Sequence, residues 1–139
     1  MKTTDLRMFT EAWIWLALAR TMLLFLPFRK LAPILGKKTF PAQGEAEGLH
    51  YSKDRLRCIG TAIRRAGKRS PWRTECFEQA LAGKLMLKAR RMNSTVFFGV
   101  SKNMQKGNFN AHAWLQCGNH VVTGNKHLEQ FTVIACFKS

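Results

Sequence analysis

The segment Ser70-Pro71-Trp72-Arg73-Thr74-Glu75-Cys76 holds the signals that decide how this chain folds. It predicts the start of a helix, because it offers two hydroxyl side chains that can cap and a proline suited to a first turn. The apolar residues that follow recur at the helical period as far as Leu87. Cys76 should therefore lie in the first turn or two, where unpaired backbone N–H groups favour the thiolate form of a thiol.

Beyond Asn93 the apolar period changes from helical to alternating, which predicts strands. The expected strands cover residues 95–100, 111–117, 120–122 and 130–137, with a polar loop at 101–110 and a hairpin turn at Gly118-Asn119. Helices followed by an antiparallel sheet are typical of the α+β class. His112 falls at the start of the second strand, 36 residues after Cys76.

The N-terminal part reads as two helices, the first ending at Pro27 and the second at Gly36. Arg20 divides the first apolar run into pieces that we consider too short to span a bilayer, so the helix is expected to pack on the domain or on a partner protein. Peripheral membrane contact is the alternative, and the side chains for it are Trp13, Trp15 and Phe25.

Three regions are predicted from these patterns. Residues 1–40 form an N-terminal helical region, residues 41–50 a linker, and residues 51–139 the core. The stretch from Lys37 to His50 reads as exposed, and a short helix from Ser52 to about Ala66 follows it, ended by Gly67.

The four cysteines, at positions 58, 76, 117 and 136, fit neither a disulfide framework nor a metal site. The chain has no C-x-x-C pair and no histidine at a zinc-finger spacing, so no metal and no cofactor is predicted. Because no secretory signal is recognisable, a cytoplasmic, reducing location with free thiols is expected. Cys117 and Cys136 should pack within apolar strands.

The chain is strongly basic, with 23 Lys and Arg against 8 Asp and Glu and a net charge of +15. Residues 53–91 carry 12 of the cations. Three interpretations are open: a nucleic-acid surface, an acidic peptide or protein partner, or a solvated face. No aromatic interleaving and no helix-turn-helix or finger pattern accompanies the charge, so nucleic acid is not favoured.

A thiol on a helix and an imidazole on a sheet can form a cysteine nucleophile and its base. The competing interpretation is that Cys76 is a buried core residue, which is the common fate of a free cysteine.

The ordered motifs of the chain resemble those of the transglutaminase-like leader peptidase of lasso peptide biosynthesis. The motifs that carry the resemblance are Pro71-Trp72-Arg73-Thr74-Glu75-Cys76, the Leu81–Leu87 helix, Val96-Phe97-Phe98-Gly99-Val100, His112-Ala113-Trp114, Phe131-Thr132-Val133-Ile134-Ala135 and the N-terminal Leu26-Pro27-Phe28-Arg29-Lys30-Leu31-Ala32.

This resemblance implies a transglutaminase-like or papain-like core, in which a helix carrying the cysteine packs on an antiparallel sheet carrying the histidine. It implies a cysteine peptidase that removes the leader peptide from a ribosomally made precursor before an ATP-dependent lasso cyclase closes the ring. The chain has no room for a leader-recognition domain, so it resembles the stand-alone peptidase half of a split system and is expected to need that domain as a partner protein.

The resemblance assigns the nucleophile to Cys76 and the general base and acid to His112. Trp72 is expected to wall the cleft, and with Arg73 to contact the substrate. Trp114 is interpreted as a core residue beneath the site.

The third member of the expected triad departs from the family pattern, because Val121-Val122-Thr123-Gly124-Asn125 contains no carboxylate and Gly124 takes the aligned position. Asn125 is the predicted orienting residue, with Thr123 or a backbone carbonyl as alternatives. The missing acid also leaves open a catalytically degenerate scaffold of the maturation complex.

Overall fold

A computed structural model describes residues 3–39, 53–70, 76–103, 108–118, 120–125 and 128–138. The elements in these ranges are α1 (Thr3–Phe25), α2 (Phe28–Leu35), β1 (Lys37–Thr39), α3 (Lys53–Lys68), α4 (Cys76–Ala89), β2 (Thr95–Asn103), β3 (Asn108–Cys117), β4 (His120–Thr123), a 3-10 turn (Leu128–Gln130) and β5 (Thr132–Lys138). The α+β class predicted from the sequence is confirmed.

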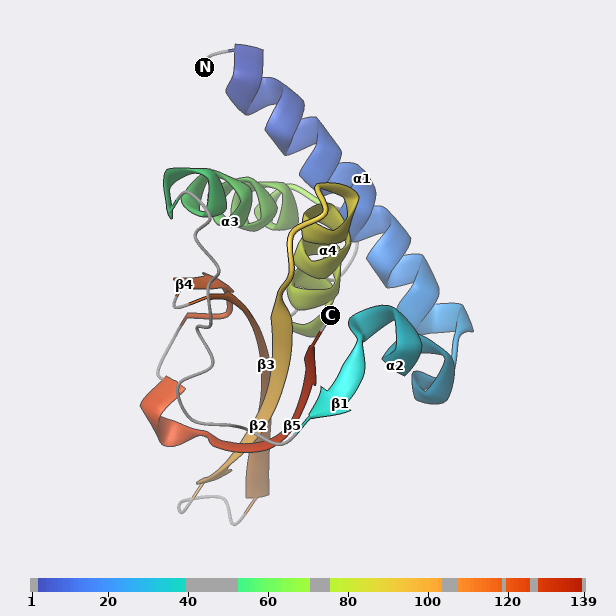
Figure 1. The fold of residues 1–139 in the computed structure, drawn as a ribbon, viewed down its shortest axis with the longest axis vertical. Coiled ribbons are helices and arrows are strands. Elements are labelled where there is room, and N and C mark those ends of the chain that lie inside the picture. Colours follow the sequence, from blue (N-terminus) through green and yellow to red (C-terminus); the bar gives the residue numbers. More distant parts are fainter. Residues whose placement is uncertain are drawn as a thin grey trace.

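The strands form one antiparallel sheet in the order β1-β5-β2-β3-β4. The helices gather on one side of it, with α1 lying diagonally across α3 and α4 (Figure 1). α4 contacts β2, β3 and β4, and α3 contacts α4 and β4. The helix with the cysteine therefore rests on the strand with the histidine.

The sheet is larger than the sequence predicts at two places. Within the expected loop 101–110, residues 101–103 and 108–110 are strand, because β2 and β3 pair out to Asn103 and Asn108. Residues 37–39, expected to be an exposed linker, form β1 on the edge of the sheet beside β5. Three residues are too few to reveal an alternating period, and exposed Lys37 and Lys38 are the charged side chains that edge strands favour. The linker predicted at 41–50 lies outside the described residues.

The apolar N-terminal segment is one continuous helix that ends before Pro27, as predicted, but Arg20 does not leave it too short to span a bilayer. By length and composition alone, Leu6–Phe25 is sufficient to cross a membrane. One side of this helix packs into the protein, where Ala12, Leu16 and Ala19 are fully buried. Arg20 is an ion-pair partner of Glu78 on α4 at 3.0 Å, so its charge is compensated within the fold.

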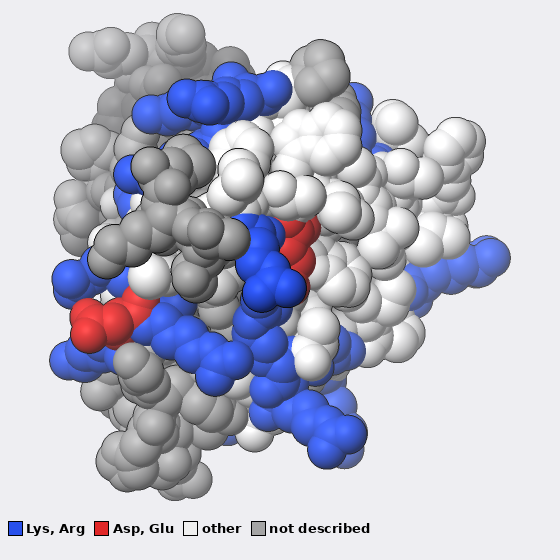
Figure 2. Space-filling view, turned by 90° about the horizontal axis from the view of Figure 1, so that it is seen from above, with Lys and Arg blue, Asp and Glu red and all other residues white. Residues whose placement is uncertain are grey.

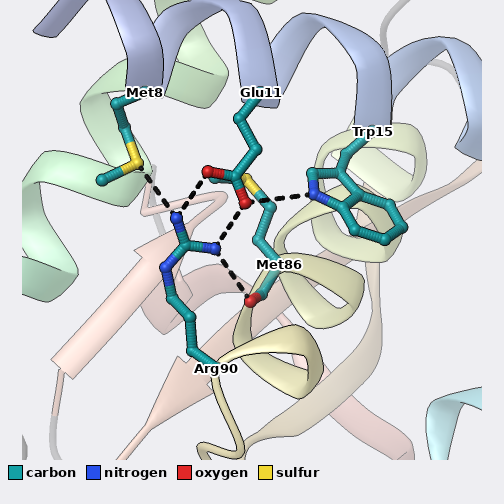
Figure 3. Close-up of polar contacts among 5 residues, drawn as sticks. All are labelled: Met8, Glu11, Trp15, Met86 and Arg90. Atoms are coloured by element: carbon teal, nitrogen blue, oxygen red, sulfur yellow. Dashed lines mark hydrogen bonds and ion pairs between the residues drawn. The ribbon is translucent and has the colours of Figure 1, made fainter. Parts of the chain in front are cut away.

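A second ion pair fixes α1 to the end of α4 (Figure 3). Two guanidinium nitrogens of Arg90 donate to the two carboxylate oxygens of Glu11, each at 2.6 Å. The same guanidinium donates to the Met86 carbonyl at 3.2 Å, and the indole N–H of Trp15 donates to Glu11 at 3.3 Å. Bidentate geometry of this kind fixes orientation as well as distance.

The core is shared by all layers. Its buried apolar residues include Leu16 of α1, Leu35 of α2, Ile63 of α3, Leu81 of α4 and Leu115 of β3. The N-terminal helical region predicted at 1–40 is thus packed together with the helices and strands of the predicted core.

α4 also buries a charged residue. Lys84 has no exposed surface, and its ammonium donates to the carbonyl oxygen of Ser94 at 2.5 Å. Burial and, to a smaller extent, the nearby Lys88 ammonium lower the pKa of Lys84 to about 7, while Cys117 opposes both effects. The adjacent thiol of Cys117 donates to the Asn93 carbonyl, and burial raises its pKa.

Candidate active site

Cys76 is the first residue of α4 and is half-buried. This placement matches the helix start predicted from the sequence. α4 is held against the sheet by close packing at Gly83, where an added Cβ would lie 2.7 Å from the Leu115 side chain. Trp72 and Arg73, the predicted substrate contacts, lie outside the described residues.

His112 lies on β3 opposite Gly99 of β2, and its ring is half-buried. Its Nε2 atom lies 2.7 Å from the carbonyl oxygen of Gly124. A carbonyl only accepts hydrogen bonds, so Nε2 carries the proton in this arrangement. In the neutral ring Nδ1 is then the unprotonated nitrogen, which is the atom a general base uses.

Two aromatic side chains support the His112 ring. The Phe131 ring stacks on it with centroids 4.9 Å apart and planes 29° apart, and the Trp114 ring stacks at 5.8 Å and 26°. Trp114 is 5% exposed, as expected of a core residue beneath the site. The imidazole is therefore restrained by a hydrogen bond and by two apolar surfaces.

Cys76 and His112 line the same cavity, which has a volume of about 550 Å³. The structure thus brings together the two residues that the sequence analysis named as nucleophile and base. The other residues that line this cavity are Arg57, Gly60, Arg64, Lys68, Gln79, His120, Val121, Val122, Gly124 and Asn125.

Gly124 cannot be replaced by an acid without rearrangement. Its φ of +79° lies in the left-handed region. A Cβ at this position would lie 2.8 Å from the Ala113 carbonyl oxygen and 2.9 Å from the Trp114 Cβ. Glycine is thus required by both conformation and space, and the backbone carbonyl, one of the alternatives left open by the sequence, makes the contact to His112.

The two side-chain alternatives have different positions. Asn125 lines the cavity and is exposed, while the Nε2–H group of His112 donates to the carbonyl oxygen of the neighbouring Gly124. An orienting role for Asn125 remains a prediction. Thr123 is 1% exposed, and in the described part of the chain its hydroxyl has no hydrogen-bond partner. Its hydroxyl therefore does not orient the ring in this structure.

Sequence reasoning missed several residues of the cavity. Gln79 follows Cys76 by three positions, a spacing that places both on one face of a helix and could have identified it. The three cations of α3 that line the cavity, Arg57, Arg64 and Lys68, were recognised only as part of a basic surface. His120 was expected only as the first residue of a strand, with no role at the site. It lines the cavity, and its pKa is lowered by burial and then by the charges of Arg57 and Lys53.

None of the four cysteines, all of them described, forms a disulfide; Cys117 and Cys136 are buried as predicted, and Cys58 is exposed. Among the described residues, no group of three or more His, Cys, Asp and Glu side chains is placed to hold a metal ion.

Comparison with known protein families matches residues 22–136 to the transglutaminase-like superfamily. The match covers most of the chain and includes both Cys76 and His112. The chain therefore belongs to the transglutaminase-like superfamily. Neither the search of curated proteins nor the search of solved structures found a match.

Proposed function

We propose that this protein is a cysteine peptidase that removes the leader peptide from a lasso peptide precursor. The observation that carries the proposal is the shared cavity, which is lined by a thiol at a helix start and by an imidazole with its Nε2 proton directed to a carbonyl. Membership of the transglutaminase-like superfamily supports thiol chemistry at this cavity. The choice of a lasso precursor rests on the resemblance of the ordered sequence motifs.

In the proposed reaction, Nδ1 of His112 accepts the proton of the Cys76 thiol. The thiolate attacks the carbonyl carbon at the junction between leader and core, forming a C–S bond. The C–N bond then breaks, and the imidazolium gives its proton to the departing amine. Water, activated by the same imidazole, releases the leader from the thioester and regenerates the thiol.

The N-terminal position of Cys76 on α4 supports the tetrahedral intermediate. The first N–H groups of a helix have no intrahelical acceptor and point out of the helix end. The backbone N–H of Cys76 is therefore the proposed donor to the oxyanion.

The proposal includes two partner proteins, a leader-recognition domain and an ATP-dependent lasso cyclase, and a cytoplasmic location. A reducing compartment would keep Cys76 as a thiol, which the mechanism requires.

The decisive experiment incubates a cognate precursor with this protein and its leader-recognition partner and follows the products by mass spectrometry. We expect cleavage at one junction by the wild type, none by Cys76→Ala, and a rate reduced by about a hundredfold to ten-thousandfold in His112→Ala. Cys58→Ala is the matched control, because it removes an exposed thiol that does not line the cavity. Cleavage by Cys76→Ala would refute the mechanism. Partner binding without cleavage by any variant would favour the scaffold.

A further inference from the structure

The helix α3 forms one wall of the cavity that holds Cys76 and His112. Its backbone lies close to the sheet at Gly60, where an added Cβ would collide with the carbonyl oxygen of Val122 on β4. Arg57 and Arg64 lie about one turn to either side of Gly60, and Lys68 lies one turn beyond Arg64. The glycine thus allows a row of three cations to lie along the cavity.

The three cations are exposed and are available to a ligand. Among the residues with described side chains, two carboxylates are already engaged, Glu11 with Arg90 and Glu78 with Arg20. No ion pair joins a carboxylate of the described residues to the α3 row. Among the described residues that line the cavity, none is Asp or Glu. Lys and Arg side chains also gather on the end of the molecule where α1 begins (Figure 2).

We propose that the α3 row, defined as Arg57, Arg64 and Lys68, binds an acidic segment of the peptide substrate. This inference rests on the proposed peptidase function and names the class of substrate. Arg64 and Lys68 are about 6 Å apart along the helix axis, at about 1.5 Å per residue. Two residues of an extended peptide span about 6.6 Å, so carboxylates at alternate positions match this pair. The Arg57 guanidinium extends the row toward His120. The pKa of His120 is lowered chiefly by burial and then by the charge of Arg57.

Carboxylates fit this cavity better than a nucleic-acid strand. The described lining offers no Phe, Tyr or Trp side chain on which bases would stack. It does offer two guanidinium groups, which bind carboxylates in a planar, bidentate manner. The row also lies in the same concavity as the thiol, so a bound acidic segment would be held close to the reacting carbonyl.

The test measures binding in the full-length Cys76→Ala chain, which cannot turn over. The probe is a fluorescein-labelled peptide of six Gly-Asp repeats, compared by fluorescence anisotropy with six Gly-Asn repeats at low salt. We expect Arg64→Gln and Lys68→Gln each to weaken binding of the acidic peptide about threefold to fivefold, the range of an exposed ion pair. Arg65→Gln is the matched control, because Arg65 is an exposed neighbour on α3 that does not line the cavity.

A second measurement uses the active thiol of the otherwise wild-type chain. We expect Arg64→Gln to lower the ratio of Cys76 alkylation by iodoacetate to that by iodoacetamide about threefold, and Arg65→Gln to leave it unchanged. The inference would be overturned if Arg64→Gln and Arg65→Gln had equal effects, or if the Gly-Asp and Gly-Asn peptides bound equally well. It would also be overturned if a single-stranded oligonucleotide displaced the labelled acidic peptide more strongly than an unlabelled acidic peptide of the same charge. If the wild type does not cleave the precursor but the acidic peptide still binds as expected, the result would count against the peptidase function and not against the acidic-peptide site.

Discussion

The Nε2 atom of His112 and the carbonyl oxygen of Gly124 lie 2.7 Å apart, across the gap between β3 and the chain that leaves β4. A backbone carbonyl presents a dipole where a triad acid would present a full charge. It can fix the tautomer and the ring orientation, but it stabilises an imidazolium less than a carboxylate does. Because cysteine is acidic enough to react without a full triad, this weaker partner is compatible with thiol catalysis.

Restoring an acid at position 124 is expected to damage the protein. Gly124→Asp would place a Cβ at a φ of +79° and within 3 Å of both Ala113 and Trp114. We expect a loss of about 2 kcal/mol or more in the free energy of unfolding, measured by urea denaturation. Asn125→Asp is the control, because it adds the same charge at an exposed neighbour. Equal stability of the two variants would show that residue 124 tolerates a side chain.

Asn125 itself should matter little for the rate. Its side chain is exposed, and the contact to His112 is made by the preceding carbonyl, which remains after substitution. We expect Asn125→Ala to cleave precursor within about threefold of the wild-type rate, whereas His112→Ala loses about a hundredfold or more. Single-turnover cleavage assays measure both. A loss in Asn125→Ala comparable to that in His112→Ala would instead establish the amide as the orienting group that the sequence predicts.

The sequence was sufficient to predict the helix start at Cys76 and the strand with His112, because both depend on local signals. These signals are the capping residues, the proline and the change of apolar period, and each lies within about ten residues of the element that it predicts. The Gly124 carbonyl contact could not be read in this way. It depends on the register of β4 on β3, on a left-handed glycine, and on a backbone atom that every residue possesses.

The errors of the sequence analysis also have physical causes. Arg20 interrupts the apolar run as it is read in the sequence, because its partner Glu78 lies 58 residues away. The sequence predicts a linker at Lys37 and Lys38 because their strand is held by pairing with β5 and has no apolar pattern of its own. Compensation and pairing between distant segments are properties of the folded chain.

The Glu11–Arg90 pair should contribute measurably to the attachment of α1. Both guanidinium contacts are 2.6 Å long, and the Arg90 guanidinium holds the pKa of Glu11 below its usual 4.5. We expect a coupling energy of about 1 kcal/mol from a double-mutant cycle with Glu11→Gln and Arg90→Met, near neutral pH.

The pH dependence of this coupling follows from the lowered pKa. A depressed carboxyl pKa gives stability that is present above the unfolded value of 4.5 and is lost as the pH falls through the folded value. The coupling should therefore vanish in acid. The same cycle with the exposed neighbour Arg91 should give no coupling at any pH, and a coupling equal to that of Arg90 would contradict the pairing.

Lys84 should make the protein more stable as the pH rises above neutrality. Its pKa is about 7 in the folded chain and 10.5 in the unfolded chain, chiefly because burial disfavours the ammonium. Between these values the unfolded state binds more protons, so the free energy of unfolding increases with pH. Below about pH 7 the ammonium is charged in both states, and the cost of burying it is fully present. The difference is of the order of a few kcal/mol.

The measurement compares urea unfolding of the wild type and Lys84→Met at several pH values from about 6 to 10. We expect the wild type to gain stability relative to Lys84→Met across this window, although the variant leaves the Ser94 carbonyl without its donor. Taking the difference removes the general relief of charge repulsion in a chain of net charge +15. Lys30→Met, at an exposed position of α2, is the control and should run parallel to the wild type. Parallel curves for Lys84→Met as well would mean that the buried amine keeps its ordinary pKa, with hydration or a counter-charge compensating its burial.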